Sequence, residues 1–169
     1  GPVFTSTSHG YDTLDHYRVD PRLGDEEDLL TLLREARARG VRVVLDGVFN
    51  HLSQDHEIVR RATAPGATDE ERSWVRWVGE HTRGFEGNLD LVELDLTRPV
   101  VQDHVVDVMS HWLAVGFDGW RLDAAFAPGP DVWAPIIERV RAAHPDAWIL
   151  AEQISGDYVD FVRRSGVDS

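Results

Sequence analysis

The feature that most constrains the fold is a repeated order of an amphipathic helix, a short apolar strand and a polar residue at the strand's end. In the first repeat, a helix is predicted from Asp25 up to Gly40, a strand over residues 41–45, and Asp46 directly after the strand. Acidic residues begin this helix and a glycine ends it, as the helix dipole and the usual stop signals favour. The strand is largely apolar, which is typical of parallel strands covered on both faces.

The same order occurs twice more along the chain. The further predicted elements are helix 99–116, strand 117–122, helix 131–144, strand 147–151 and helix 157–164. Helix–strand units of this kind predict an α/β fold with a parallel sheet, because right-handed crossovers place the carboxyl ends of all strands at one rim. Polar residues at these strand ends are therefore expected to lie close together.

The repeat is interrupted between His51 and Leu96, where only residues 68–78 show a helical pattern. A Thr-x-x-Glu capping box formed by Thr68 and Glu71 predicts the start of this helix. A structureless loop of more than about 15 residues is unusual in a compact domain. Residues 52–96 are therefore predicted to form a small inserted subdomain at the rim where the strands end.

The charge of the chain excludes two classes of partner. The 169 residues include 17 basic and 30 acidic side chains, which gives a net charge of −13. Such a chain repels a phosphate backbone and an anionic lipid surface, so neither nucleic acid nor a membrane is an expected partner. The chain has no cysteine, which removes disulfides and thiolate chemistry, and its compartment is left open.

Several short motifs occur in one order along the chain, and the last three lie at the predicted strand ends. They are His9-Gly10-Tyr11-Asp12, Asp20-Pro21-Arg22-Leu23-Gly24, Asp46-Gly47-Val48-Phe49-Asn50-His51, Gly119-Trp120-Arg121-Leu122-Asp123-Ala124-Ala125 and Leu150-Ala151-Glu152. Together they resemble the conserved regions of the α-amylase family of glycoside hydrolases (glycoside hydrolase family 13). The resemblance implies that residues 1–169 form a partial catalytic domain: a partial (β/α)8 TIM barrel with roughly strands 2 to 5 and the inserted subdomain after strand 3.

The resemblance also implies roles for three polar residues. Asp123 matches the nucleophile of the family, Glu152 matches the general acid and base, and Arg121 matches the residue that holds the nucleophile. A retaining glycosidase needs two carboxyl groups about 5 to 5.5 Å apart, one ionised and one protonated. Arg121 and Asp123 share one face of a strand, and a guanidinium favours the ionised carboxylate. Glu152 follows an apolar strand, whose desolvating effect favours the neutral acid.

Three further residues match sugar-binding positions of the family. Tyr11 matches the aromatic platform under the sugar, and His9 and His51 match histidines that donate hydrogen bonds to its hydroxyls. Each has a structural alternative, which is a buried tyrosine or a core or loop histidine. Trp74 and Trp77 are either packing residues, the favoured interpretation, or part of a sugar site.

No metal or cofactor is predicted. Asn50 matches a position that binds calcium in some members of the family, but no cluster of oxygen ligands accompanies it in the sequence. Asp46 is expected to support the site, paired with Arg121.

The expected partner is an oligosaccharide substrate. A full barrel takes about 250 residues, so the chain is expected to be a piece of a longer protein and nearly inactive by itself, because a third carboxylate of the family is not matched here. The leading interpretation is a retaining glycoside hydrolase acting on α-glucosidic linkages of maltodextrin-like oligosaccharides. A transglycosylase or glucosyl isomerase on the same scaffold, and a non-catalytic sugar-binding remnant, remain as alternatives.

Overall fold

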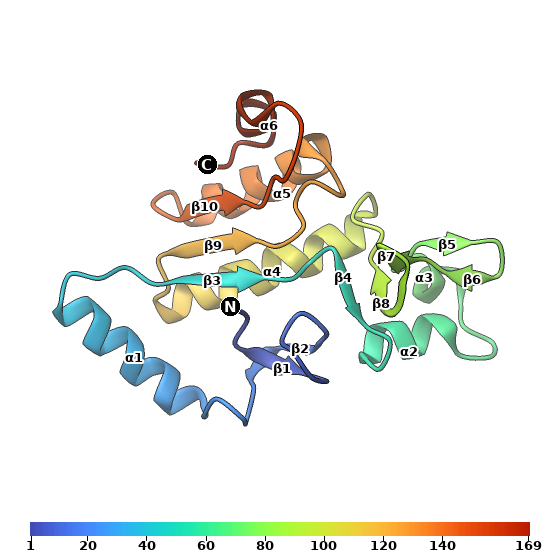
Figure 1. The fold of residues 1–169 in the computed structure, drawn as a ribbon, viewed down its shortest axis with the longest axis horizontal. Helices are drawn as coiled ribbons and strands as arrows, with labels where there is room; N and C mark the ends of the chain where they lie inside the picture. Colours follow the sequence, from blue (N-terminus) through green and yellow to red (C-terminus); the bar gives the residue numbers. More distant parts are fainter.

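The computed structural model describes all residues 1–169, and a three-stranded parallel sheet lies at its centre (Figure 1). The strands are β3 (Val44–Gly47), β9 (Gly119–Leu122) and β10 (Trp148–Ala151), in the order β10–β9–β3. All three are predicted by their apolar runs, and their order along the sheet follows their order along the chain. The parallel α/β arrangement is therefore confirmed, and these three strands do not close a barrel.

The beginning of the chain differs from the prediction of a further barrel strand. β1 (Phe4–Ser6) pairs antiparallel with β2 (Thr13–Val19) and forms a separate two-stranded sheet. A loop of six residues joins the two strands, and this local pairing is the pairing that β1 forms, with none to β3.

The helices of the three repeats form where the sequence predicts them. They are α1 (Glu26–Ala38), α4 (Pro99–Val115), α5 (Pro130–Ala143) and, after β10, α6 (Tyr158–Ser165). Asp25 caps α1 in a reciprocal capping box with Asp28, and Gly116 ends α4 with a φ of 124°. The longest helix, α4, has 17 residues, and no helix is both long and apolar enough to cross a membrane.

Three buried tryptophans connect the helices to neighbouring parts of the chain. The indole N–H of Trp120 in β9 donates to the carbonyl of Met109 in α4, at 3.2 Å. Trp112 of α4 donates to the carbonyl of His16 in β2, at 2.8 Å, and Trp133 of α5 donates to the carbonyl of Ala125, at 3.1 Å. Each indole is almost completely buried and its polar atom has a partner, so these large side chains stabilise the core without leaving an unsatisfied donor.

Residues 52–96 lie beyond the carboxyl ends of β3 and β9 (Figure 1). They and His51 form an antiparallel sheet in the order β4–β8–β7, two short helices and a two-residue hairpin. The elements are β4 (His51–Ser53), α2 (Glu57–Thr63), α3 (Asp69–Arg72), β5 (Trp77–Val78), β6 (His81–Thr82), β7 (Gly84–Phe85) and β8 (Asn88–Glu93).

The helix predicted over residues 68–78 is wrong beyond its first turn. The capping box of Thr68 and Glu71 is present, but α3 has only four residues. The segment that follows is held by strand-like bonds, since the N–H of Arg76 donates to Glu93 at 2.9 Å and the N–H of Asp95 donates to Trp74 at 2.8 Å. Pairing with the end of β8 therefore overrides the local helical pattern.

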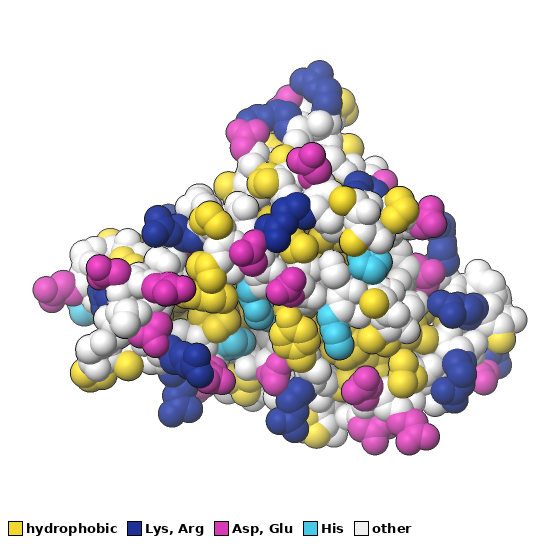
Figure 2. Space-filling model, turned by 180° about the vertical axis from the view of Figure 1, so that it is seen from behind, with side chains coloured by type: hydrophobic (Ala, Val, Ile, Leu, Met, Phe, Trp, Pro, Cys, Tyr) yellow, Lys and Arg dark blue, Asp and Glu magenta, His cyan; other side chains and the backbone are white.

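The face of the molecule opposite to that in Figure 1 carries interspersed acidic and basic side chains, with apolar and histidine side chains toward its middle (Figure 2). Within the molecule, His16 packs against His56 and His104, with ring centroids 6.2 and 5.7 Å away. Burial lowers the pKa of His16 to about 3 and that of His56 to about 4, so both rings are neutral at pH 7.

Candidate active site

The register of the parallel sheet brings the predicted polar residues together. Asp46 of β3 lies directly opposite Arg121 of β9. Asp123 follows two residues after Arg121, and Glu152 follows two residues after Leu150, the partner of Arg121 in β10. Side chains two residues apart point to the same face of a strand, so all four polar side chains share one side of the sheet at its carboxyl end. The N–H groups of Asp123 and Glu152 continue the ladder, each 2.9 Å from the carbonyl of the neighbouring strand.

One guanidinium group links the three carboxylates. Nη1 of Arg121 lies 2.5 Å from Oδ1 of Asp46 and 2.8 Å from Oδ1 of Asp123, and its Nη2 lies 2.9 Å from Oε1 of Glu152. The expected pairing of Asp46 with Arg121 is therefore present. Because Asp123 and Glu152 contact the same planar group, their carboxylates face a shared space and do not lie on opposite sides of the sheet.

The electrostatics of Asp123 differ from the sequence-based expectation. Asp123 is 7% exposed, and its burial raises the pKa of its carboxyl to about 6, although Arg121 acts to lower that pKa. Arg121 divides its charge among three carboxylates, so its effect on Asp123 does not outweigh desolvation. The sequence favours Glu152 as the desolvated group, but 34% of its side chain is exposed. Burial therefore acts on Asp123 more strongly than on Glu152.

A strained residue positions Glu152. Ala124 has a φ of 49°, in the left-handed region that costs a non-glycine residue roughly 1–2 kcal/mol. In this conformation the N–H of Ala124 donates to Oε2 of Glu152 at 2.8 Å. Together with the contact of Oε1 with Arg121, this bond fixes both oxygens of the Glu152 carboxylate.

An open cavity of about 380 Å³ lies above these residues. The residues that line it are Tyr11, His51, Phe85, Glu86, Leu91, Arg121, Asp123, Ala124, Phe126, Glu152 and Ile154. Five of the six predicted site residues are among them. The hydroxyl of Tyr11 donates to Oδ2 of Asp46 at 3.3 Å, and burial and the charge of Asp46 raise the pKa of Tyr11. Tyr11 therefore joins the carboxylate network from its edge.

His51 is buried and stacks on Phe85, with ring centroids 4.6 Å apart and an interplanar angle of 15°. Its Nε2 lies 3.1 Å from the carbonyl oxygen of Tyr11, and burial lowers its pKa to about 4, so the ring is neutral at pH 7. A neutral imidazole that donates from Nε2 uses its one N–H on the protein. His51 thus holds the Tyr11 backbone beside the cavity, and hydrogen bonding from His51 to a sugar stays a prediction.

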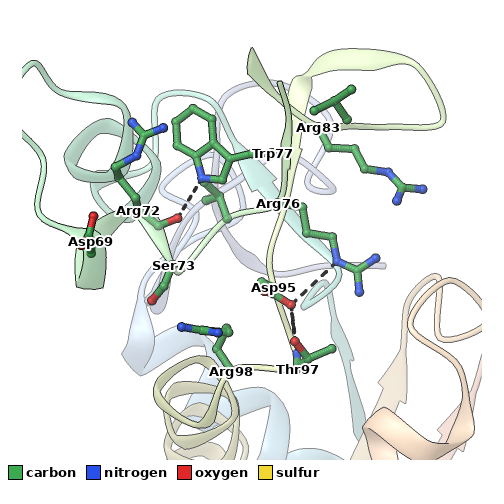
Figure 3. Close-up of a pocket in the computed structure, with 11 residues that line it drawn as sticks. Asp69, Arg72, Ser73, Arg76, Trp77, Arg83, Asp95, Thr97 and Arg98 are labelled. Atoms are coloured by element: carbon green, nitrogen blue, oxygen red, sulfur yellow. Dashed lines mark hydrogen bonds and ion pairs between the residues drawn. The ribbon is translucent and has the colours of Figure 1, made fainter. Parts of the chain in front are cut away.

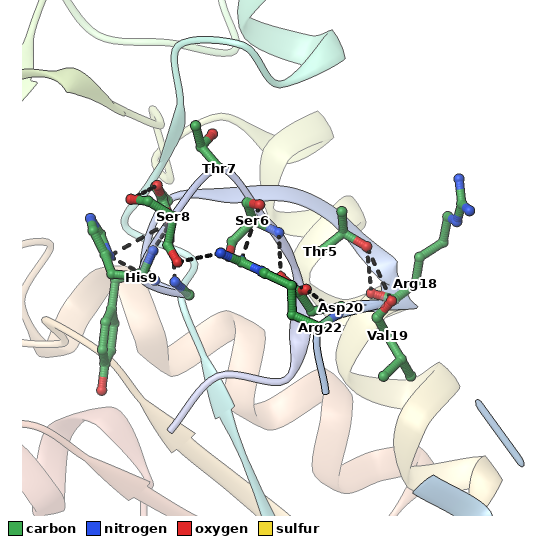
Figure 4. A network of polar contacts seen from close by, with 12 residues as sticks. Thr5, Ser6, Thr7, Ser8, His9, Arg18, Val19, Asp20 and Arg22 are labelled. Atoms are coloured by element: carbon green, nitrogen blue, oxygen red, sulfur yellow. Dashed lines mark hydrogen bonds and ion pairs between the residues drawn. The ribbon is translucent and has the colours of Figure 1, made fainter. Parts of the chain in front are cut away.

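His9 does not reach this cavity, so the geometry gives no support to its predicted contact with sugar. Its side chain is 53% exposed, and its Nδ1 accepts the N–H of Tyr11 at 3.2 Å. His9 lies instead with Asp20 and Arg22 in a polar network around a separate cavity (Figure 4). The guanidinium of Arg22 donates to Asp20 Oδ1 at 2.8 Å and to the Ser8 carbonyl at 2.5 Å, which fixes the loop that carries Tyr11.

Sequence reasoning missed five residues of the cavity: Phe85, Glu86, Leu91, Phe126 and Ile154. Phe126 directly follows a recognised motif, and its position there was a usable signal. Phe85 and Glu86 lie in the β7–β8 hairpin, where no local pattern marks them. No group of three or more histidine, aspartate or glutamate residues in the structure is arranged to hold a metal ion. The side-chain amide of Asn50 lies 3.4 Å from Nδ1 of His51.

Comparison with known proteins gives one family match. Residues 1–90 match the family model described as alpha amylase, catalytic domain. The matched range contains Tyr11, Asp46 and His51, and it ends before Arg121, Asp123 and Glu152.

Relatives of known name extend the similarity over most of the chain. Alpha-amylase 2 of Dictyoglomus thermophilum is 33% identical over 153 residues, and a cyclomaltodextrinase of Geobacillus thermopakistaniensis is 32% identical over 166 residues. Each alignment covers 89% of this chain and 27% of the relative. The chain thus spans about a quarter of the length of these relatives.

Solved structures agree with this similarity. A debranching enzyme of Nostoc punctiforme, in a crystal soaked with acarbose, superposes with a TM-score of 0.85 at 34% identity and covers 97% of this chain and 38% of its own. A cyclic α-maltosyl-(1→6)-maltose hydrolase of Arthrobacter globiformis, in complex with that sugar, has a TM-score of 0.80 at 31% identity and covers 90% and 36%.

Proposed function

Because this chain belongs to the family of α-amylase catalytic domains, we propose that its cavity is the sugar-cleaving site of a retaining glycoside hydrolase acting on α-glucosidic linkages. Asp123 is the nucleophile, Glu152 is the general acid and base, and Arg121 holds Asp123 in place. The observation that carries this proposal is the contact of one guanidinium with both carboxylates, at 2.8 and 2.9 Å, inside a cavity of about 380 Å³.

The two chemical steps follow from these positions. In the first step, an oxygen of Asp123 attacks the anomeric carbon while Glu152 gives a proton to the leaving glycosidic oxygen. In the second step, water attacks the glycosyl–Asp123 bond, gives its proton to Glu152 and releases Asp123. Each carboxyl group returns to its starting state. Glu152 exchanges its contact with Arg121 for the glycosidic oxygen when substrate enters, and its partial exposure leaves room for this movement.

Tyr11 and the aromatic rings near it bind the sugar. Tyr11, Phe85 and Phe126 line the cavity and offer flat apolar surfaces to the C–H faces of a pyranose. The names of the relatives, which include cyclomaltodextrinases and maltogenic amylases, favour a maltodextrin-like oligosaccharide as the substrate.

Residues 52–96 form the proposed subdomain beside the catalytic site. Phe85, Glu86 and Leu91 come from this region and line the cavity together with Asp123 and Glu152. The sheet β4–β8–β7 therefore shapes the space available to substrate, and its hairpin at Glu86, which has a φ of 50°, forms part of the wall.

By itself, the 169-residue chain is proposed to cleave glucans slowly or not at all. The family resemblance implies a third carboxylate that stabilises the transition state, and no motif of this chain matches it. Loss of one such group typically costs on the order of 100-fold to 1000-fold in rate. Hydrolysis of maltotriose by the purified chain within about tenfold of a typical enzyme rate would contradict this part of the proposal.

Covalent trapping tests the central assignment. A fluorinated α-glucosyl fluoride forms the glycosyl–enzyme but slows its hydrolysis, so mass spectrometry can locate the attached sugar. We expect the label on the peptide that contains Asp123, and no label in Asp123→Asn. The Glu152→Gln variant is the matched control, since a fluoride leaving group needs little acid assistance and the label should still form. Attachment to Glu152, or to another residue, would contradict the assignment.

A further inference from the structure

A second cavity, of about 600 Å³, lies apart from the proposed catalytic site (Figure 3). Four arginines line it: Arg72, Arg76, Arg83 and Arg98. They are four of the 17 basic residues in a chain with 30 acidic ones. None of the four lines the catalytic cavity. A strongly acidic chain therefore has a local concentration of positive charge around one hollow.

Three carboxylates lie near these four arginines and leave an excess of positive charge: Asp69 and Asp95 line the hollow, and Glu93 pairs with Arg83. Oδ1 of Asp95 accepts the hydroxyl of Thr97 at 2.6 Å and its N–H at 3.3 Å, and Nε of Arg76 lies 3.9 Å from the same oxygen. Arg83 contacts Glu93 through Nε at 3.1 Å, which leaves its terminal amino groups available. Ion pairs of these four arginines are formed by Arg76 and Arg83 alone.

Arg72 is held in place by an aromatic ring instead of a carboxylate. Its guanidinium carbon lies 3.8 Å from the ring centroid of Trp77, whose indole N–H donates to the Arg72 carbonyl at 2.9 Å. Stacking of this kind orders a guanidinium while its in-plane N–H donors stay free. Figure 3 shows Asp95 and Thr97 between Arg76 and Arg98, so the arginines are distributed around the hollow.

The start of α4 adds to the same potential. Arg98 is the residue before this 17-residue helix, and the first turn has no acidic residue and no side-chain cap. The N-terminal end of a helix carries a partial positive charge. An anion at this rim would be attracted by both the helix and the arginines.

From these contacts we propose that this hollow, defined by the four arginines and Trp77, is a binding site for a small molecule that carries a phosphate group. Guanidinium groups match the geometry of phosphate oxygens, and a volume of this size suits a small ligand. Trp77 is half-buried and provides an apolar surface for a carbon skeleton. Two sources share this chemistry, inorganic phosphate and a sugar phosphate. The site is independent of the proposed hydrolysis.

Calorimetric titration of the chain tests this proposal. The probes are inorganic phosphate, glucose 6-phosphate and glucose, at constant ionic strength set with potassium chloride. We expect heat of binding with at least one phosphate-bearing probe, and weaker binding of glucose that the arginine variants leave unchanged. The double variant Arg72→Gln/Arg98→Gln should bind that probe about tenfold more weakly or worse, because it loses two charge-assisted contacts.

A matched double variant controls for net charge. Arg18→Gln/Arg34→Gln removes the same two charges from exposed positions outside the hollow, and it should bind the probe as the unchanged chain does. Equal weakening by both double variants would overturn the proposal, as would absence of binding by either phosphate probe. Thermal unfolding of each variant checks that the fold is kept.

The source of the phosphate is decided by comparing the two probes. Tighter binding of glucose 6-phosphate, weakened by Trp77→Phe, assigns the site to a sugar phosphate. Equal binding of the two probes, unchanged by Trp77→Phe, assigns it to free phosphate.

Discussion

Replacing Asp123 by asparagine should stabilise the fold at neutral pH. Burial raises the pKa of Asp123 from 3.8 to about 6. Between these two values the folded chain keeps a proton that the unfolded chain has lost, so stability falls as the pH rises through this window. A shift of about two pKa units corresponds to about 3 kcal/mol. Asparagine has the shape of the protonated carboxyl group and does not ionise, so it avoids the free-energy cost of a buried charge.

The size of the effect should depend on pH. Above about pH 7, Asp123→Asn is expected to be about 3 kcal/mol more stable than the unchanged chain, and below about pH 4 the two should be equal. The assay is urea unfolding followed by tryptophan fluorescence at pH 4, 5, 6 and 7.5. Glu138→Gln removes a carboxylate from an exposed position of α5 and serves as the control. It should show no comparable gain at pH 7.5.

The opposite outcome has a clear meaning. If Asp123→Asn is less stable than the unchanged chain at pH 7.5, the ion pair with Arg121 outweighs the burial of Asp123. A gain that does not change between pH 4 and pH 7.5 would also refute the argument, because it would not come from ionisation.

Three other perturbations test other parts of the structure. Gly119→Ala would place a Cβ 1.8 Å from the carbonyl oxygen of Trp148, so it should separate β9 from β10. The free energy of unfolding in urea should fall by roughly 1–3 kcal/mol or more, and an unchanged midpoint would contradict this. Arg121→Lys keeps the charge but replaces the two terminal nitrogens that contact the three carboxylates by one ammonium group. The free energy of unfolding in urea at pH 7.5 should fall by about 1.5–3 kcal/mol, and an unchanged value would show that the planar guanidinium is not needed. In the Asp123→Asn variant, which lacks the opposing contribution of Asp123, acidification from pH 7 to pH 4 should lower the stability. Burial lowers the pKa of His16 to about 3 and that of His51 to about 4, whereas the unfolded chain binds protons on both near pH 6.5; stability of this variant that rises over this range would argue against their burial.

The sequence predicts those elements that are specified by local signals. Helix α1 begins at a capping aspartate, α4 and α5 begin at a proline, and all three have a stop signal and one apolar face. Strands β3, β9 and β10 are short apolar runs that follow them. Crossovers of this kind place the carboxyl ends of parallel strands at one edge, which explains why the sequence alone groups Asp46, Arg121, Asp123 and Glu152 there.

Elements that depend on distant partners could not be predicted in this way. β4 and β8 pair with each other across the 34 residues that separate Ser53 from Asn88, and their local sequences carry few strand signals. Helix α2 was missed because its cap is His56, whose Nδ1 accepts the N–H of Ile58 at 3.1 Å, in place of a usual capping residue. A short window of sequence does not indicate contacts of this kind between distant segments.

The electrostatics of the site were also beyond local reasoning. Whether Arg121 or burial decides the pKa of Asp123 depends on how many carboxylates contact the guanidinium. That number is known only once Asp46 and Glu152 are placed in the structure. Likewise, His9 and His51 have similar motif contexts, but only His51 packs on Phe85 beside the cavity.

The most direct test of the account is a crystal structure of the chain soaked with maltotriose at high concentration. We predict a glucose ring on Tyr11, a carboxylate oxygen of Asp123 facing its anomeric carbon, and Glu152 within about 2.6–3.2 Å of the glycosidic oxygen after leaving Arg121. A sugar bound elsewhere with the catalytic cavity unchanged, or Asp123 and Glu152 facing different groups of the sugar, would contradict the claim that these two carboxylates act on one linkage.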